Sequence, residues 1–348
     1  MYFYESTSTD PYENLALEEH LFETLPEGAG LFMLWQNTDA VIIGRYQNAA
    51  EEIDAAYVKE NGIAVVRRMS GGGAVFHDLG GLNYTLITDD AESPIWQACM
   101  TPLLEVLRGY GLDARFSGRN DIEIGGKKIA GCAQYARGSR TLHHGCILFG
   151  TDLSKVAAAL DPGEAKFISK SDKSVRARVT TIRACLDAMR TQLAQDRGEP
   201  AMPDIAAGIV PDMETFRRDL RDAYGAEQGA PLTPYLLAPT DADAVRRLQE
   251  EKYRTWEWNY GYRTDYQVHR EQRFAAGLVA ADMDVEGGRI RAVRFSGDFF
   301  ADGDLTAFER SLAGLALDET LLAALRERGA DAVIAGIGTE DLAALLTA

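Results

Sequence analysis

The sequence predicts an α+β fold in which antiparallel hairpins and helices intermix. Two runs that suit strands meet at Gly125-Gly126, and two others meet at Gly287-Gly288. Paired glycines between alternating runs are typical of tight hairpins, which join antiparallel strands. Helical stretches stand among these runs, but not one after every strand. The pattern therefore favours an α+β fold over a doubly wound parallel sheet.

The first helix is predicted from its capping residues. Asp10 precedes Pro11, and Glu13 follows three positions after the cap, which is the signature of a helix start. The remaining elements of the N-terminal half are expected to be two strands, a helix ended by Asn61-Gly62, two strands, a helix, a hairpin and a further strand. Their expected ranges are 31–35, 40–44, 51–60, 63–70, 82–88, 95–110, 121–134 and 141–150.

A proline-rich stretch divides the chain. Six of the eleven prolines lie between residues 195 and 240, around one helical stretch at about 213–224. We predict a first domain over 1–240, with 195–240 including the linker, and a second domain over 241–348. The second domain is expected to contain a strand pair and two further helices.

Composition narrows the class of protein. The chain is 46% hydrophobic and 26% charged, and its formal net charge of −17 argues against a general nucleic-acid binder. The N-terminus has no signal-peptide pattern, and no apolar run is long enough to cross a bilayer. The four cysteines show no CxxC spacing and lie in a long chain. We therefore expect reduced thiols and no disulfide framework. We therefore expect a cytoplasmic protein that binds neither membrane nor nucleic acid.

The most distinctive motif is RRMSGGGAVFHD at residues 67–78, in which two arginines precede three glycines. Consecutive glycines let a backbone present several N–H groups to one anion without obstruction by Cβ atoms. A flanking arginine adds charge-assisted hydrogen bonds to phosphate oxygens. No GK[ST] of a Walker A loop follows. The motif predicts either a phosphate-binding nest of another kind or a flexible hairpin loop.

Two adjacent histidines, His143 and His144, fall in a predicted strand. Neighbours on a strand point to opposite faces, so both cannot ligate one metal ion. At most one of them is expected to face a site.

Lys127 and Lys128 directly follow the Gly-Gly turn, and the same alternation sends one of them inward. An inward lysine beside Asn120 and Asp121 is expected to be paired with a carboxylate. It is then positioned to polarise a substrate carboxylate or an α-phosphate.

The segment 166–190 reverses the charge of the chain, with seven basic residues against two acidic ones. It predicts either a mobile loop that closes over a polyphosphate or a solvated basic surface.

Five motifs occur in one order along the chain: RRMSGGGAVFHDLG, SGRNDIEIGGKKIAGCAQY, LHHGCILFGTDL, KSVRARVTTI and WEWNYG. With RIRAVRFSGDFF and IGTEDLAALL near the C-terminus, they make nearly the whole chain resemble the lipoate–protein ligase A family. The resemblance implies a mixed-sheet catalytic domain of the biotin and lipoate protein ligase type and a small α+β accessory domain.

The same resemblance implies an ATP-dependent ligase. Such an enzyme converts lipoate and Mg²⁺-ATP to lipoyl-AMP and pyrophosphate. It then transfers the lipoyl group to a lysine of an apo lipoyl domain of a 2-oxoacid dehydrogenase E2 or of a glycine cleavage H protein.

Site residues are carried over from the family motifs. Lys128 matches the lysine that touches the lipoate carboxylate and the α-phosphate, and it is the expected catalytic residue. Arg68 is expected to contact nucleotide phosphates. Ala133, Ile147 and Val75 are expected to wall a slot for the lipoyl tail. The cofactor-binding residues implied are Arg68, Ser70, Gly71, Gly72, Gly73, Ala74, Val75, Phe76, His77, Asp78, Asn120, Asp121, Lys128, Ala133 and His144. No metal ligand is assigned.

Two departures from the family pattern leave alternatives open. Gly81 stands where asparagine is usual, and Cys132 where serine is usual. Cys132 raises the alternative of a cysteine-dependent octanoyl or lipoyl transferase. Related transferases, however, carry the nucleophile before the GKK-like lysine, where this chain has RFSGRND. A non-catalytic lipoyl-binding protein is a third possibility, which loss of Lys128 or of the glycines would have favoured.

Overall fold

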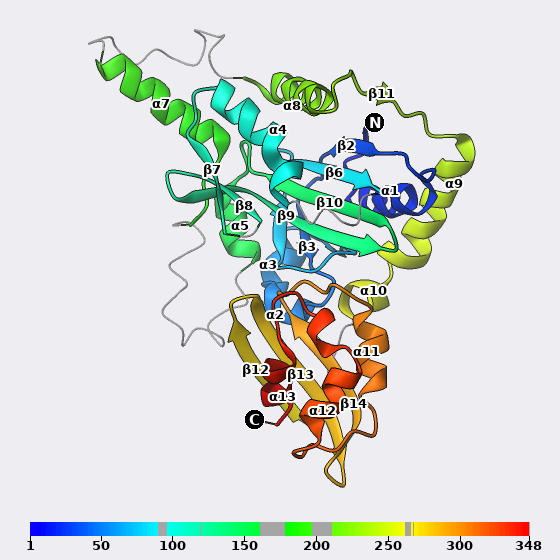
Figure 1. Ribbon diagram of the computed structural model, residues 1–348. Helices are drawn as coiled ribbons and strands as arrows, with labels where there is room; N and C mark the ends of the chain where they lie inside the picture. The colour runs from blue at the N-terminus through cyan, green and yellow to red at the C-terminus, as the bar shows by residue number, and fades with distance from the viewer. Residues whose placement is uncertain are drawn as a thin grey trace. The chain divides into compact units, whose positions relative to one another are not determined.

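The computed structural model forms two compact units, each described here by itself (Figure 1). Unit 1 comprises Met1–Val41, Asp54–Ala64 and Val75–Tyr253, and unit 2 comprises Ile42–Ile53, Val65–Ala74 and Arg254–Ala348. The structure describes residues 1–89, 96–118, 120–160, 178–196, 211–261, 266 and 268–347. The predicted boundary at residue 240 remains a prediction.

Unit 1 is built on an eight-stranded mixed sheet of order β11-β1-β2-β6-β10-β9-β8-β7. Strand β1 is parallel to β2 and β11, and the other neighbouring pairs are antiparallel. The predicted hairpin turn at Gly125-Gly126 joins β8 to β9 and is confirmed. The strands are β1 (Tyr2–Glu5), β2 (Leu31–Trp35), β6 (Leu82–Thr88), β7 (Ala114–Ser117), β8 (Asp121–Ile124), β9 (Lys127–Arg137), β10 (Arg140–Ile147) and β11 (Thr233–Pro234).

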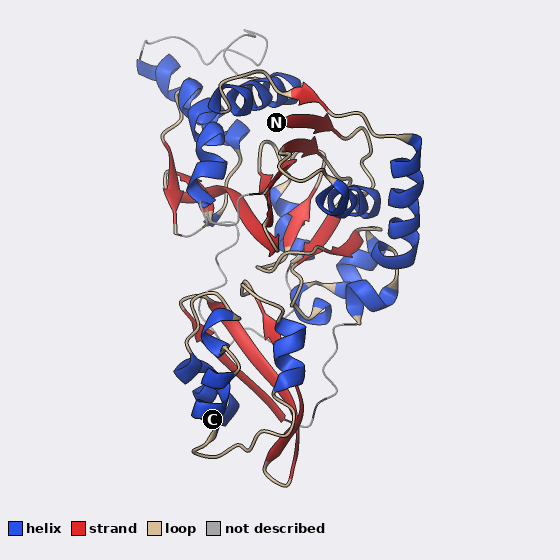
Figure 2. Cartoon of the chain, turned by 45° about the vertical axis from the view of Figure 1, so that its right-hand side comes forward, coloured by secondary structure: helices blue, strands red, loops and turns tan. Residues whose placement is uncertain are grey.

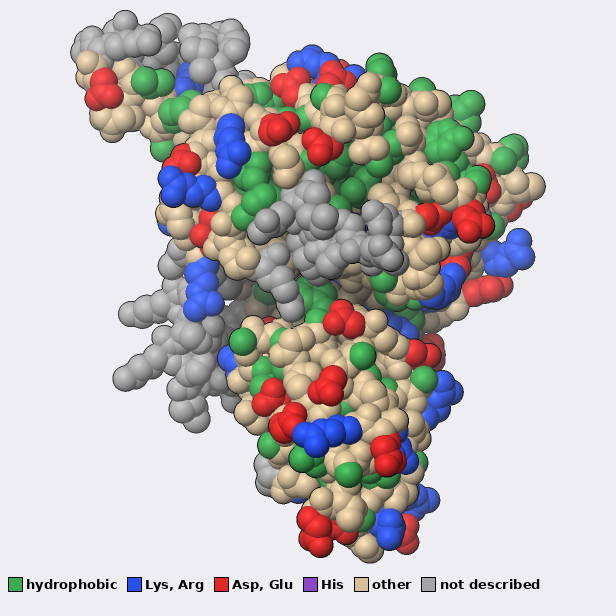
Figure 3. Space-filling model, in the orientation of Figure 1, with side chains coloured by type: hydrophobic (Ala, Val, Ile, Leu, Met, Phe, Trp, Pro, Cys, Tyr) green, Lys and Arg blue, Asp and Glu red, His purple; other side chains and the backbone are tan. Residues whose placement is uncertain are grey.

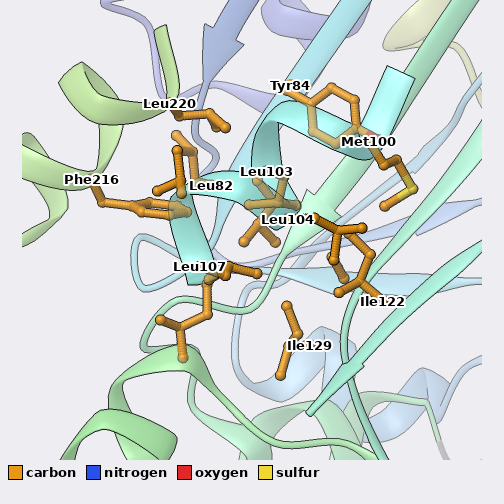
Figure 4. Close-up of a cluster of buried hydrophobic side chains, with 14 of the residues drawn as sticks. Leu82, Tyr84, Met100, Leu103, Leu104, Leu107, Ile122, Ile129, Phe216 and Leu220 are labelled. Carbon is orange, nitrogen blue, oxygen red and sulfur yellow. The ribbon is translucent and has the colours of Figure 1, made fainter. Parts of the chain in front are cut away.

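One face of this sheet packs against three helices, α4 (Trp96–Gly109), α7 (Ile182–Asp196) and α8 (Met213–Glu227). Leu103, Leu104 and Leu107 point from α4 into this core, as the sequence predicts (Figure 4). The predicted inward side chain of Trp96 lies outside the described residues. Burial of this many aliphatic and aromatic side chains is the main stabilising term for such a layer.

Helix α1 (Pro11–Thr24) covers the opposite face of the sheet. It begins where the sequence predicts, because the Asp10 side chain accepts a hydrogen bond from the backbone N–H of Tyr12. Helix α9 (Pro239–Leu248) and the π-helix η2 (Gln249–Tyr253) pack on α1. The Lys252 ammonium and the Tyr253 hydroxyl both bond to Glu19 there.

A three-stranded sheet of order β4-β3-β5 carries the motif of residues 67–78. The single helix predicted over 51–60 is wrong, because α2 ends at Glu52 with an extended Ile53, and Asp54 then caps a new helix by accepting a hydrogen bond from the Tyr57 N–H. The elements of this region are β3 (Ala40–Ile43), α2 (Ala49–Glu52), α3 (Ala55–Glu60), β4 (Ala64–Arg67), β5 (Val75–His77) and α5 (Leu153–Ala159).

Unit 2 contains a three-stranded antiparallel sheet of order β12-β13-β14, with the predicted turn at Gly287-Gly288 (Figure 2). Helix α11 packs beside β14, and α13 packs against β12 and β13. The prediction of a strand pair followed by two helices is wrong in number, since the described residues contain a third strand, β12, and three α-helices after the sheet. The elements are α10 (Trp256–Tyr260), β12 (Val268–Phe274), β13 (Gly277–Glu286), β14 (Arg289–Gly297), α11 (Leu305–Ser311), α12 (Leu321–Glu327), the short 3₁₀ turn η3 (Ala330–Ala332) and α13 (Thr339–Thr347).

Candidate functional site

The predicted site residues are divided between the two units. Those of unit 2 precede β5 in the chain, and those of unit 1 lie on β5, β8, β9 and β10 or beside them. Unit 2 holds Arg68, Ser70, Gly71, Gly72, Gly73 and Ala74, and unit 1 holds Val75, Phe76, His77, Asp78, Asn120, Asp121, Lys128, Ala133 and His144.

Arg67, the first arginine of the motif, is an internal residue of unit 2 with only 1% of its surface exposed. Its guanidinium donates to five backbone carbonyls, which lie in two segments of the chain. The acceptors are Gly44 (2.8 Å), Arg45 (3.1 Å), Gln47 (2.7 Å), Trp258 (2.9 Å) and Asn259 (2.8 Å). These hydrogen bonds satisfy the donors of the buried guanidinium. Arg67 thus acts as a structural clamp, a residue that holds the two segments together.

Arg68 holds the glycine loop in shape. Its guanidinium donates to the carbonyls of Gly71 (2.6 Å), Gly73 (2.8 Å) and Ile42 (3.1 Å), and to Ser70 Oγ (3.1 Å). The side chain is 6% exposed. Arg68 therefore organises the loop backbone and adds a positive charge within it.

The close approach that the glycines predict is made in unit 2 by the segment around Phe299. The backbone N–H of Gly72 donates to the carbonyl of Phe299 at 3.0 Å. A Cβ atom on Gly71 would lie 2.4 Å from that carbonyl oxygen, and Gly72 has a φ of +88°. Gly73 differs, because nothing lies within 4 Å of the position of its Cβ. In this structure, the place of a Cβ on Gly71 is taken by the Phe299 carbonyl and that on Gly72 by the side chains of Phe300 and Arg68, whereas Gly73 is open.

Asp78 closes the turn after β5. Its Oδ1 accepts from the backbone N–H groups of Gly80 and Gly81, both at 3.0 Å, and its Oδ2 accepts from the N–H of Asp152 at 2.8 Å. Gly81 is the position at which the sequence departs from the asparagine of the family motif. A Cβ atom added to Gly81 would lie 3.2 Å from the hydroxyl oxygen of the buried Thr151.

His77 is oriented by a neighbour from the end of β2. Asn37 Nδ2 donates to His77 Nδ1 at 3.1 Å, which leaves the ring proton of the neutral imidazole on Nε2. Asn14 on α1 in turn donates to Asn37 Oδ1 at 2.9 Å. The rings of Trp35 and His77 pack in a T-shaped arrangement at a centroid distance of 5.8 Å.

A buried carboxylate on α1 organises His144, and sequence reasoning missed it. Glu18 is 1% exposed and lies 2.9 Å from His144 Nδ1, and it accepts a hydrogen bond from Thr85 Oγ1 at 2.6 Å. Trp35 Nε1 donates to the same hydroxyl at 2.9 Å. The available signal was that Asn14 and Glu18, four residues apart, interrupt the apolar face of the helix.

His143 points to the other face of β10, as strand alternation predicts. It is 2% exposed, and burial lowers its pKa to about 4. The His143 imidazole is therefore neutral at physiological pH. His144, on the opposite face of β10, is the histidine that contacts Glu18.

Lys128 is the inward lysine of the pair, and the prediction of its pairing is confirmed. Its Nζ lies 2.8 Å from Asp121 Oδ1, whereas Lys127 is exposed. The Lys128 carbonyl accepts from the N–H of Thr180 at 2.9 Å, which fixes the strand at this point. A positive group is thus held at the edge of the β8-β9 hairpin beside a carboxylate.

Asn120 supports the same hairpin. Its amide donates to the carbonyl of Cys132 at 2.6 Å, and its own carbonyl accepts from the Cys132 N–H at 2.9 Å. Ala133 pairs with His144 in the sheet register. Ile147 instead lies in the core formed with α4, so the prediction that it shares a slot with Ala133 is wrong.

All four cysteines are free and have raised pKa values. Burial raises the pKa of Cys99, Cys132 and Cys146 to about 12, and it also raises that of Cys185. A thiol nucleophile requires a lowered pKa. This set of cysteines does not supply an activated thiolate.

Among the described residues, no group of three His, Cys, Asp or Glu side chains is arranged to hold a metal ion. In that same part of the chain, no helix has both the length and the apolar character of a membrane span. Basic and acidic side chains are interspersed on the face drawn in Figure 3. Residues 166–177 of the basic segment 166–190, which the sequence predicts to be a lid or a solvated surface, lie outside the described residues.

Comparison with known families gives two matches. The lipoyl protein ligase A/B catalytic domain matches residues 10–197, and the bacterial lipoate protein ligase C-terminus matches residues 263–346.

Curated relatives match over most of the chain. A lipoate–protein ligase 1 of Staphylococcus aureus is 36% identical over 88% of this chain and 87% of its own length. A lipoate–protein ligase of Bacillus subtilis is 35% identical over 91% of both chains.

Several solved structures share the fold, among them the following three. A bipartite lipoate protein ligase described with its E2 lipoyl domain, from Thermoplasma acidophilum, is 28% identical, with a TM-score of 0.62 over 77% of this chain and 98% of its own. A protein of the same organism with bound lipoic acid is 27% identical (TM-score 0.59; 75% and 98% covered). A lipoate–protein ligase A bound with ATP is 26% identical (TM-score 0.60; 75% and 98% covered).

Proposed function

Because the chain belongs to the lipoate–protein ligase family, we propose that it joins lipoate to a carrier-protein lysine in two steps driven by ATP. The observation that carries the chemistry is the ammonium of Lys128, which is held 2.8 Å from Asp121 at the end of the β8-β9 hairpin. The ATP and lipoic acid bound by structural relatives support these substrates.

In the first step, a carboxylate oxygen of lipoate attacks the α-phosphorus of ATP. The bond to the β-phosphate bridge breaks, and pyrophosphate leaves. Two anions approach each other in this step, so a fixed positive charge between them stabilises the transition state. Lys128 supplies that charge in our proposal, and its exposed neighbour Lys127 does not.

In the second step, the neutral amine of the carrier lysine attacks the acyl carbon of lipoyl-AMP, AMP leaves with the bonding electrons, and the nitrogen releases one proton to solvent as the amide forms. A carboxylate by itself would have to expel oxide, whereas the adenylate expels a stable phosphate monoester. The carriers we propose are lipoyl domains of E2 subunits, in line with the relative described with its E2 domain, and the glycine cleavage H protein.

Magnesium enters as part of the substrate Mg²⁺-ATP, in which phosphate oxygens and water molecules are its ligands. The proposed nucleotide site includes the open backbone at Gly73 and the Arg68 charge that shapes the loop. The predicted cytoplasmic location remains a prediction.

The cysteine-dependent transferase is disfavoured by the raised pKa values of all four thiols. A non-catalytic lipoyl-binding role would leave the Lys128 ammonium, held beside Asp121, without a reaction to stabilise.

The test is incubation of the full chain with lipoate, ATP, magnesium and an apo E2 lipoyl domain. We expect pyrophosphate release and a lipoylated carrier, both dependent on ATP. If the apo domain is instead acylated without ATP when an octanoyl-carrier is the donor, the protein is a transferase. If the apo domain is modified under neither condition, the protein is a non-catalytic lipoyl-binding protein.

A further inference from the structure

Gly131 lies in the middle of β9, where glycine weakens a strand because it adds no side chain to the sheet. Its backbone is not in the left-handed region, since it is absent from the positive-φ glycines of the described chain. Any L-residue can adopt its backbone conformation. A requirement for glycine must therefore come from space.

The space beside Gly131 is occupied by the ion pair of the proposed site. A Cβ atom on Gly131 would lie 2.5 Å from Lys128 Nζ, 2.6 Å from Lys128 Cε and 3.2 Å from Asp121 Oδ1. In the strand register, Asp121 on β8 is the direct partner of Gly131. The carboxylate thus stands beside the bare Cα, and the lysine side chain lies over it.

We propose that Gly131 is a positioning residue for Lys128. Its missing side chain keeps open the place where the ammonium meets the Asp121 carboxylate, and so fixes where the positive charge faces the reacting groups. The inference rests on the proposed function, because the role of Lys128 is itself proposed there.

Gly145, on the neighbouring strand, is a glycine of a different kind. A Cβ atom there would lie 2.5 Å from Tyr84 Cε1 and 2.7 Å from the carbonyl oxygen of Gly131. Neither a ring packed in the core nor a strand backbone can move aside at a small cost in free energy. At Gly131, by contrast, the two atoms within 3 Å are the end of the flexible Lys128 side chain, and the third near atom is Asp121 Oδ1, also of a side chain. An alanine there should displace Lys128 and leave the fold in place.

The experiment compares Gly131→Ala with Gly109→Ala. Gly109 ends α4, and no atom lies within 4 Å of its Cβ position. We expect Gly131→Ala to melt as the wild type does and to release pyrophosphate from lipoate and ATP at least about tenfold more slowly, since small misplacements of a reacting group are costly. Gly109→Ala should be unchanged in both measurements.

Two further measurements separate a positioning role from a general loss. In a Lys128→Ala background, Gly131→Ala should have no additional effect on pyrophosphate release, because both changes act through one ammonium. Without substrates, Gly131→Ala should alter labelling of Lys128 by an amine-reactive reagent, read by mass spectrometry against Lys127 in the same chain.

Wild-type pyrophosphate release by Gly131→Ala, alongside an inactive Lys128→Ala, would overturn this inference and leave the proposed function standing. Additive losses in the double variant, or an unfolded Gly131→Ala, would also overturn it. If the wild-type chain releases no pyrophosphate from lipoate and ATP, the proposed function fails first and this inference falls with it.

Discussion

At the scale of single residues, neighbours with the same chemistry have different environments. Lys127 is exposed and Lys128 is paired with Asp121, although both follow the same turn. Arg67 is clamped by five carbonyls, whereas Arg68 shapes the glycine loop. The alternation of a strand produces the first difference, and tertiary contacts produce the second.

Replacing Lys128 by alanine should reduce pyrophosphate release by at least about a hundredfold, because the charge between the two anions is lost. Lys127→Ala is the matched control and should stay close to the wild type. Stopped-flow detection of pyrophosphate measures both. A larger loss from Lys127→Ala would contradict the assignment.

Arg67→Lys should destabilise the protein by roughly 3 kcal/mol, since an ammonium has fewer donors than the guanidinium and leaves buried carbonyls unmet. Denaturant unfolding measures this effect. Arg178→Lys, on an exposed residue, is the control and should be neutral. An unchanged midpoint for Arg67→Lys would show that the clamp contributes little.

Cys132→Ser should retain ATP-dependent lipoylation within a few-fold of the wild type. Burial raises the pKa of this thiol to about 12, so a thiolate is scarcely populated at neutral pH. Mass spectrometry after incubation with octanoyl-carrier, without ATP, is the measurement. A covalent adduct on Cys132 would replace the ligase by a transferase.

At the scale of elements, the glycine loop has two parts with different constraints. Gly71 and Gly72 approach the backbone of Phe299, and Gly73 is open. A phosphate-binding loop and a tightly packed turn would both require glycine. The loop sequence alone therefore leaves the two uses indistinguishable.

Gly71→Ala and Gly73→Ala should separate these two uses. Gly71→Ala should lower the melting temperature by several degrees, because its methyl group would collide with a carbonyl oxygen. Gly73→Ala should leave the melting temperature unchanged and weaken ATP binding, read by calorimetry. Equal ATP affinity in Gly73→Ala and wild type would exclude this glycine from the nucleotide site.

At the scale of the whole molecule, the two units contain buried groups that titrate with opposite effects on stability. In unit 1, burial lowers the pKa of His143 from 6.5 to about 4, so the unfolded chain binds more protons between these values. In unit 2, burial raises the pKa of Glu309 from 4.5 to about 7, so the folded chain binds more protons there.

The stability contribution of His143 should therefore be lost as the pH falls from 6.5 to 4, and that of Glu309 should be lost as the pH rises from 4.5 to 7. Hydrogen exchange read by mass spectrometry follows each unit separately. His143→Leu should flatten the first trend and Glu309→Gln the second. Unchanged pH slopes in either variant would refute the corresponding assignment.

The sequence by itself determined what depends on neighbouring residues. The cap of α1, the hairpins at Gly125-Gly126 and Gly287-Gly288, and the opposite facing of Lys127 and Lys128 all follow from turn chemistry and strand period. These features involve partners within a few residues, so the local pattern records them.

Only the tertiary structure decided which groups meet across long separations. The Arg67 clamp draws on carbonyls more than 190 residues away, and Glu18 meets His144 over 126 residues. No local period records such pairs, because their partners are brought together by the packing of whole elements. The space beside Gly131 is of the same kind: a missing side chain has a meaning only when the atoms that fill its place are known.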